Sequence, residues 1–562
     1  MPTDNLLRGH WGPLLGLVAF TLASLALGVA ANRFASGRAG FLRKYFLGNR
    51  SMGALAVALT AAVMSGGTFL GFPSLVYSFG WVVGLWIASY MVAPLTVLGI
   101  LGKRIGQLAR LTGAITLPDL YRERYGSPAL GLLASVLIMF FLTVFLVAQF
   151  KAGAVIIQEV MPPQSYDWLS RQTWARNVDP SQFGYRVGLI VFATTVVAYT
   201  AYGGFLAAIW TDVFQSLVMA IGVLILLPLA LAKAGGLAAA TQAGMNLAGP
   251  GFAFGPGAAA PNVPGHEFHP AGLAFSFFVM WAISGMGQPA TLVRLMAFRD
   301  ARTLRYSIIW QCIYNALIYI PLIFIFVAAR SLLPDMVGGS DRIMPRLVVS
   351  LTNPYVAGLI LAAPYGAVMS TVSGFLLLVS SALIRDVYQR FLRPTAGEPE
   401  LAYASYAATI LVGCLAAGVA INPPRYLQLI IIFASGGMAS AFLAPAVLGA
   451  FWRRATAAGA IASMVVGAGV MLGLYALGIY GPAALKVDWL FGPNPNIGAV
   501  DAFRPYYLLG LDPCVWGLSC SFLVGIVVSC LTRPPDASRV ALLFDAQPAA
   551  PSVPSNASIE ST

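Results

Sequence analysis

Apolar residues form long runs along almost the whole chain, and polar residues gather in the shorter stretches between them. A helix needs about 20 mostly apolar residues to cross a hydrocarbon core about 30 Å thick. The pattern therefore predicts an all-α polytopic membrane protein with about 13 transmembrane helices. The expected spans are residues 11–34, 52–77, 81–102, 128–160, 186–203, 205–232, 271–293, 306–329, 354–384, 402–421, 427–450, 457–479 and 506–531.

The order of these spans indicates an internal repeat. Without the first span and the last two, ten remain, and they divide into two sets of five. Because five is odd, the second set begins on the opposite side of the membrane, which is the topology of an inverted repeat. The expected parts are an N-terminal tail with a leading helix (1–50), a first five-helix repeat (51–235), an extracellular loop (236–270), a second, inverted repeat (271–455), two C-terminal helices (456–532) and a disordered cytoplasmic tail (533–562).

The opening helix of each repeat carries residues that interrupt a helix. The first reads TAAVMSGGTFLGFP from Thr60 to Pro73, and the second reads AISGMGQPATLVRLMA from Ala282 to Ala297. Proline removes a backbone donor and glycine tolerates non-helical angles, so both helices can open midway. Backbone groups freed in a membrane need protein, water or a ligand as partners. Although such glycines also serve close packing, two equivalent breaks predict one shared binding site.

The composition agrees with a membrane protein. Hydrophobic residues make up 59% of the chain and charged residues 9%, and the mean hydropathy is +0.80. Soluble domains contain about 25% charged residues, so an ordinary soluble protein is excluded. The five cysteines lie in apolar segments and the three histidines in polar connections. We therefore expect no disulfide framework, no Cys or His metal site and no cofactor.

The distribution of basic residues predicts the orientation. With the N-terminus outside, 20 of the 33 Lys and Arg fall in inner connections, 11 in outer ones and two within spans. This asymmetry favours an outside N-terminus and a cytoplasmic C-terminus. It also explains the net charge of +13 without nucleic-acid binding. A signal peptide has a positively charged stretch before its apolar segment, which the first span lacks. A basic cluster follows the span instead, so we expect a helix that is retained in the protein.

Five stretches carry a family resemblance. In order and spacing, the chain resembles the sodium:solute symporter family, and within it looks most like the sodium/pantothenate symporter branch. The matching stretches are YFLGNRSMG (Tyr45 to Gly53), TAYGGFLAAIWTDVFQ (Thr200 to Gln215), GQPATLVRLMA (Gly287 to Ala297), LAAPYGAVMSTVSGFLLLVSSALIRDVY (Leu361 to Tyr388) and FLAPAVLGAFWRRATAAGA (Phe442 to Ala460).

The resemblance implies a leucine-transporter-like 5+5 fold that binds sodium between the first and eighth core helices. The family's sodium ligands fall here on Ala61 and Met64, through their carbonyls, and on Ala367, Ser370 and Thr371. The last three have i, i+3, i+4 spacing and so share one helical face. Hydroxyls in membrane helices also commonly bond back to a carbonyl one turn earlier. No metal other than sodium is expected.

Solute contacts are expected at the two breaks and on the helices that face them. A small organic ligand needs a mostly apolar pocket with a few convergent polar groups. Trp281 lies at a position that the family resemblance associates with substrate, although membrane tryptophans also serve as packing or interfacial residues. The candidates are Ser65, Gly66, Gly67, Thr68, Trp281, Gly285 and Gln288.

Three charged residues fall within or near the ends of spans, where charge is costly and indicates function. Asp212 matches a family acidic position linked to coupling or inner gating, with a structural ion pair to a cytoplasmic arginine as the alternative. Arg294 is expected to snorkel to the inner surface. Lys151 could neutralise an anionic solute or pair with Glu159. The pantothenate branch has an apolar residue at this position, which weakens the transfer of its specificity.

These observations predict a sodium-coupled symporter of the cell (inner) membrane that imports a small organic solute by alternating access. A pantothenate-like or other monocarboxylate is favoured, and an amino acid or sugar is the alternative within the same fold. A solute sensor that does not transport is a further alternative, although the short tail contains no signalling domain. No acidic ring indicates a channel, and no nucleophile, base and orienting group indicates an enzyme. The oligomeric state is open.

Overall fold

The structure, a computed structural model, describes residues 11–34, 58–59, 64–162, 164–166, 180–253, 271–298, 300–336, 340–423, 427–482 and 503–545. Within these ranges the elements are helical, as the hydrophobic pattern predicts. Eleven helices are long and apolar enough to span a membrane, and one bent pair makes a twelfth. The expected span 52–77 is described only in part, so the total of 13 stays a prediction.

The leading helix and the first five-helix set occupy the N-terminal half. Helix α10 contains two of the expected spans, which lie at residues 182–202 and 208–233. The elements are α1 (Gly12–Phe34), η3 (Gly67–Gly71), α4 (Phe72–Phe79), η4 (Gly80–Val83), α5 (Gly84–Pro94), η5 (Leu95–Gly102), α6 (Lys103–Thr112), α7 (Leu117–Tyr125), α8 (Pro128–Val160), α10 (Pro180–Lys233), α11 (Leu237–Ala248) and η7 (Pro250–Phe252).

The second set and the C-terminal helices follow. The elements are α12 (Ala271–Ile283), η8 (Ser284–Gly287), α13 (Pro289–Ala297), α14 (Ala301–Leu332), η9 (Ser340–Arg342), α15 (Ile343–Leu351), α16 (Pro354–Ser381), η10 (Ala382–Leu392), α17 (Glu398–Val419), α18 (Leu427–Phe451), α19 (Ala457–Tyr480), η11 (Leu508–Gly510), α20 (Pro513–Leu531) and α21 (Ala537–Phe544).

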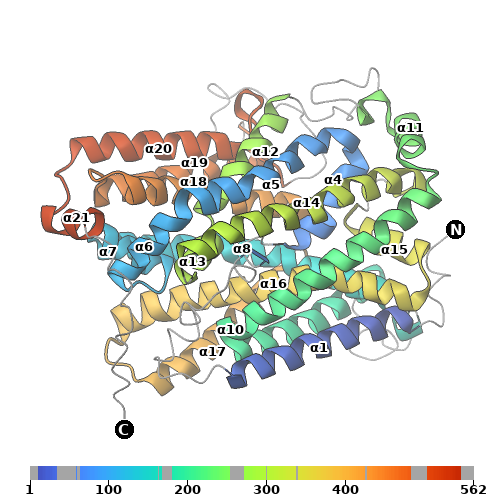
Figure 1. Cartoon of the computed structure of the whole chain (residues 1–562), viewed down its shortest axis with the longest axis horizontal. Coiled ribbons are helices and arrows are strands. Elements are labelled where there is room, and N and C mark those ends of the chain that lie inside the picture. Colours follow the sequence, from blue (N-terminus) through green and yellow to red (C-terminus); the bar gives the residue numbers. More distant parts are fainter. Residues whose placement is uncertain are drawn as a thin grey trace, which may run out of the picture.

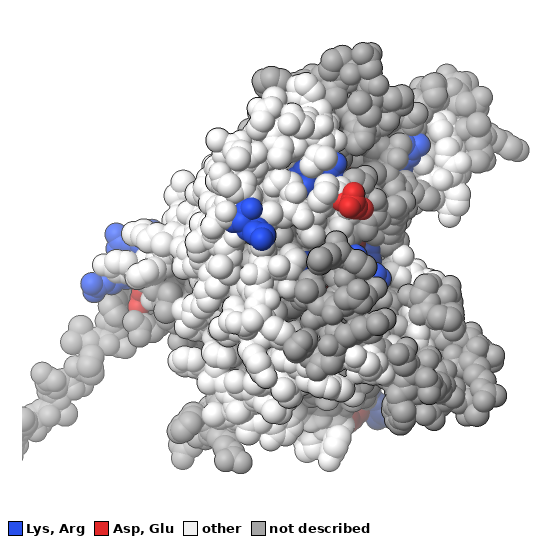
Figure 2. Space-filling view, turned by 90° about the vertical axis from the view of Figure 1, so that its right-hand side faces the viewer, with Lys and Arg blue, Asp and Glu red and all other residues white. Residues whose placement is uncertain are grey.

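The long helices run roughly along the long axis of the molecule, so its two ends carry different connections (Figure 1). Elements α11 and α15 lie at one end, and α6, α7 and α21 lie at the other (Figure 1). Figure 2 faces the first end, where only scattered charged side chains appear among the described residues. The opposite end, which we call the basic end, carries Lys103, Arg104, Arg110, Arg122 and Arg124 of α6 and α7. It is the end predicted to be cytoplasmic.

Helices α16 and α18 are the most enclosed of the spanning helices. Helix α16 packs against α1, α8 and α10, and α18 packs against α8, α19 and α20. The two central helices therefore come from the second set, and each brings polar groups to the middle of the molecule.

The end of the chain differs from the expected disordered tail. Helix α21 forms within it and packs on the basic end. Leu543 is buried, and the guanidinium carbon of Arg104 lies 4.4 Å from the ring centroid of Phe544. The apolar pair at the end of this short helix gives it a surface to bury, which the polar and proline-rich composition of the tail obscures. Residues 546–562 lie outside the described residues.

Candidate ion and solute site

The second set opens with a broken helix. Helices α12 and α13 meet at an angle of 47°, because Gln288 is extended and Pro289 begins α13 without a backbone donor. A Cβ at Gly287 would lie 2.9 Å from the Cα of Ala439 in α18, so the close approach requires glycine. The break predicted from AISGMGQP is therefore present.

The first set is also interrupted, at the non-helical residues 64–65. Side chains take up N–H groups that this break frees. The Gly66 N–H donates to Gln149 Oε1 at 2.8 Å, and the Gly67 N–H donates to Ser65 Oγ at 3.1 Å. The helix that follows the break therefore begins with two of its N–H groups already bonded.

Four of the five predicted sodium residues come together beside this break. Thr371 Oγ1 lies 2.8 Å from the Met64 carbonyl oxygen and 2.9 Å from the Ala367 carbonyl oxygen, so these two acceptors share its one proton. Ser370 Oγ lies 3.1 Å from the same Ala367 oxygen. Ala61 lies outside the described residues. We call the oxygens of Met64, Ala367, Ser370 and Thr371 the oxygen cluster.

The oxygen cluster is buried and uncharged. Ser370 is 9% exposed and Thr371 4% exposed. Their bonds to Ala367 are the local back-bonds that hydroxyls in helices commonly make. The bond from Thr371 to Met64 is different, because it joins α16 to the non-helical break across 307 residues of sequence. Neutral oxygens gathered at an unwound helix are a suitable environment for a monovalent cation.

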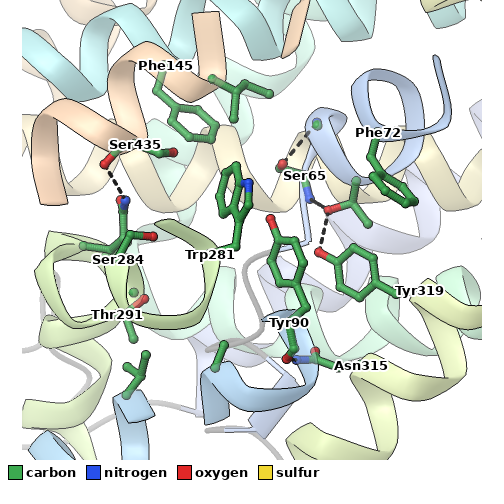
Figure 3. Close-up of a pocket in the computed structure, with 18 of the residues that line it drawn as sticks. Ser65, Phe72, Tyr90, Phe145, Trp281, Ser284, Thr291, Asn315, Tyr319 and Ser435 are labelled. Carbon is green, nitrogen blue, oxygen red and sulfur yellow. Dashed lines mark hydrogen bonds between the residues drawn. The ribbon is translucent and has the colours of Figure 1, made fainter. Parts of the chain in front are cut away.

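A cavity of about 100 Å³ lies between the two breaks (Figure 3). Six of the seven predicted solute residues line it. Gly66 does not, because it faces α8, where an added Cβ would lie 2.7 Å from Ala152 Cβ. None of the described residues lining the cavity is Asp, Glu, Lys or Arg. The predicted residues that line it are Ser65, Gly67, Thr68, Trp281, Gly285 and Gln288.

Trp281 belongs to an aromatic stack along one side of the cavity (Figure 3). Its ring centroid lies 5.9 Å from that of Trp86 and 5.3 Å from that of Tyr90. Tyr90 in turn stacks on Tyr319 at 4.3 Å. The indole Nε1 of Trp281 is buried and has no hydrogen-bond partner among the described residues. Such a stack offers a rigid apolar surface with a donor at its edge.

Polar residues from helices without breaks also line the cavity, and they were not among the predicted solute residues. Gln311 and Asn315 come from α14, and Gln428 comes from α18. The side-chain oxygens of all three are buried without a donor among the described residues. The sequence could have identified them as side-chain amides within otherwise apolar spans, because such polar groups are costly in a membrane unless they meet a partner.

Asp212 forms a buried ion pair with Arg294, with 3.6 Å between Oδ2 and Nη2. The expectation that Arg294 snorkels to the surface is wrong, since its side chain is only 10% exposed. Nη1 also donates to the Ala290 carbonyl at 3.2 Å. The pair joins α10 to α13, and therefore links the half of the broken helix nearer the basic end to a neighbouring helix. This arrangement matches the ion-pair alternative for Asp212 and is also compatible with a gating role.

Lys151 neither lines the cavity nor pairs with Glu159. Its Nζ lies 2.5 Å from Asp341 Oδ2, and both side chains are buried. The same Asp341 oxygen accepts the Leu427 N–H at 3.1 Å. Glu159 instead contacts Arg342 and Arg346 at 3.4 Å and 3.2 Å. Lys151 thus joins α8, η9 and the start of α18, and both expectations for its partner are replaced by Asp341.

Replacing Lys151 with methionine should lower the melting temperature of the purified protein by several degrees, because Asp341 would be buried without its counter-charge. Removing one partner of a buried pair costs about 3–5 kcal/mol. Lys151→Met/Asp341→Asn is the matched control and should recover much of the loss. If Lys151→Met raised the half-saturating solute concentration more than about tenfold at unchanged stability, Lys151 would be a solute contact instead.

Gln149, whose role at the first break the sequence did not indicate, is a further functional candidate. Gln149→Met is expected to lower sodium affinity about tenfold, because the Gly66 N–H at the first break loses its acceptor. A buried donor left unsatisfied costs about 1–3 kcal/mol. Sodium-dependent fluorescence of the purified variant measures this change. Gln158→Met, on the same helix but away from the cavity, is the control, and equal losses in both variants would contradict a specific role.

Comparisons with known proteins identify the family of the chain. A family model described as the sodium:solute symporter family matches residues 45–166 and 181–467. The sodium/pantothenate symporter of Escherichia coli (strain K12) is 33% identical over 461 residues, which cover 81% of this chain and 88% of the relative. The sodium/proline symporter of Haemophilus influenzae (strain ATCC 51907 / DSM 11121 / KW20 / Rd) is 30% identical over 472 residues, which cover 80% of this chain and 86% of the relative.

A solved structure supports the fold. A Na+-coupled sialic acid symporter in a substrate-bound outward-open state superimposes with a TM-score of 0.68 at 18% sequence identity. The match covers 94% of this chain and all of that structure. The relatives found by sequence are sodium-coupled transporters rather than enzymes.

Proposed function

The chain belongs to the sodium:solute symporter family, and from this premise we propose that it imports a small monocarboxylate, pantothenate or a close analogue, by alternating access. It is a multi-pass protein of the cell membrane and no enzyme. Membership of the family implies that it binds sodium and a small organic solute. The proposal concerns the solute, the residues that bind it and the orientation.

The main support for coupling between sodium and solute binding is that adjacent residues belong to the two sites. Met64 contributes its carbonyl to the oxygen cluster, and the next residue, Ser65, lines the cavity. A cation that draws the Met64 carbonyl toward α16 would therefore fix the backbone that presents Ser65 and Thr68 to the solute. Binding of either ligand would then favour binding of the other, as linkage requires.

The lining of the cavity favours a carboxylate with hydroxyl or amide groups attached. The N-terminus of α13 begins there without a side-chain cap, and helix N-termini favour anions. The Trp281 indole offers a further donor, while Gln311, Asn315 and Gln428 offer acceptors. Pantothenate, the solute named for the relative in Escherichia coli (strain K12), combines a carboxylate with hydroxyl and amide donors.

The mechanism places sodium entry at the end that carries α11 and α15 and release at the basic end. Sodium binds in the oxygen cluster, with Ala61 as a further ligand, and the solute binds in the cavity. Movement of the broken helices against α8 and α16 then opens the basic end. A charge that crosses 100 mV gains about 2.3 kcal/mol, and the sodium concentration gradient adds to this driving force.

Uptake into proteoliposomes with an imposed sodium gradient tests the proposal. The panel is radiolabelled pantothenate, L-proline and D-glucose, and potassium replaces sodium in the control. We expect pantothenate to accumulate only with sodium. Equal uptake in potassium would contradict sodium coupling, and binding without uptake would indicate a sensor.

A zwitterionic amino acid is the second candidate solute. The uncharged lining supports it, because a zwitterion carries no net charge and needs no charged partner from the protein. The relative from Haemophilus influenzae is a sodium/proline symporter. Sodium-dependent accumulation of L-proline without accumulation of pantothenate would favour this candidate.

A further inference from the structure

A second cavity, of about 30 Å³, lies next to the first on the side of the basic end. Ala290 lines both cavities. From there the second cavity extends along α13 and α16, and it reaches residues 115–118, where the connection after α6 enters α7. A solute that leaves the first cavity toward the basic end would therefore enter the second.

Arg294 is the charged side chain that lines this route. No other Lys, Arg, Asp or Glu lines either cavity among the described residues. The guanidinium lies beside Gly374 of α16, where an added Cβ would be 3.4 Å from Arg294 Nη2, an ordinary contact distance. The charge is therefore placed on the route from the solute cavity to the basic end.

The Arg294 guanidinium donates from Nη1 to the Ala290 carbonyl but makes no short hydrogen bond to Asp212. Its contact with Asp212 is 3.6 Å, whereas charge-assisted hydrogen bonds are about 2.7–2.9 Å. The second Asp212 oxygen, Oδ1, has no hydrogen-bond partner among the described residues. A guanidinium has five N–H donors in a planar fork that matches a carboxylate. Arg294 can therefore donate hydrogen bonds to a second anion while Asp212 remains close to it.

We propose that Arg294 forms a transient second binding site for the carboxylate of the transported solute, between the central cavity and the basic end. The inference rests on the proposed function, because it requires an anionic solute group. A carboxylate that leaves the central cavity loses the donors there, and an unpaired buried carboxylate is costly. Arg294 supplies the next partner and returns to Asp212 when the solute leaves.

Vesicles of opposite orientation test this site. In right-side-out and inside-out vesicles, the half-saturating pantothenate concentration is measured for the wild type, Arg294→Gln and Arg294→Lys. Arg294→Gln should raise this concentration at least about fivefold at the basic face and change it less than twofold at the opposite face. Arg294→Lys, which keeps the charge, should recover part of the affinity at the basic face.

Equal changes at both faces, or none at the basic face, would overturn the proposal. If the wild type transported neither pantothenate nor L-proline, the proposed function would be wrong instead, so the two failures are distinct. Because Arg294→Gln leaves Asp212 buried and unpaired, the variant could fail to fold. In that case Asp212→Asn/Arg294→Gln is compared with Asp212→Asn, and the same difference between faces is expected.

Discussion

Replacement of Thr371 by alanine is expected to raise the half-saturating sodium concentration at least about tenfold. Its hydroxyl joins the Met64 and Ala367 carbonyls, so the substitution removes both a proposed cation ligand and the bond between the first break and α16. Hydrogen bonds to charged groups contribute about 1.5–3 kcal/mol, and 1.4 kcal/mol is a factor of ten. Sodium-dependent uptake of pantothenate at saturating solute measures the effect.

Two matched variants separate this role from general destabilisation. Thr371→Ser keeps the hydroxyl and should stay within about threefold of the wild type. Ser380→Ala removes a hydroxyl on the same helix that bonds Leu376 and Thr409 away from the cluster, and should not change sodium affinity. Ser370→Ala should weaken sodium binding less than Thr371→Ala, because its only bond within the cluster is local. Unchanged sodium affinity in Thr371→Ala would remove Thr371 from the site.

Trp281→Ala should raise the half-saturating solute concentration by roughly thirtyfold with little change in sodium affinity. The substitution removes a ring stacked on Trp86 and Tyr90 and an indole N–H that has no hydrogen-bond partner among the described residues. Truncating an aromatic residue central to a binding site costs about 2 kcal/mol or more. Equilibrium binding of labelled pantothenate at saturating sodium measures the loss.

Trp281→Phe is the control, since it keeps the ring and loses only the donor. We expect an intermediate loss, which would assign part of the affinity to the stack and part to the indole N–H. A loss of sodium affinity as large as the loss of solute affinity in Trp281→Ala would mean that the side chain supports the break rather than the solute.

The positions of most membrane-spanning helices were predictable because each span needs a long run of hydrophobic residues. Both helix breaks were also readable, since glycine and proline act through the local backbone. The i, i+3, i+4 spacing of Ala367, Ser370 and Thr371 is sufficient by itself to place these residues on one face of a helix. These signals share one property, which is that each depends on residues close together in the sequence.

The partners of the buried charges could not be predicted in the same way. Lys151 pairs with Asp341, 190 residues away, and the tertiary arrangement brings them together. Arg294 was expected at the surface because its long side chain could reach it, yet Asp212 offers a closer counter-charge. The role of Gln149 at the first break was missed for the same reason, as its partner Gly66 is 83 residues away.

Equilibrium binding of labelled pantothenate to the purified protein, titrated with sodium, tests the central claim most directly. If the oxygen cluster and the cavity share the opened helix at Met64 and Ser65, sodium should strengthen pantothenate binding at least about tenfold. Pantothenate should strengthen sodium binding by the same factor, and potassium should do neither. Pantothenate affinity that is the same in sodium and potassium would contradict the account.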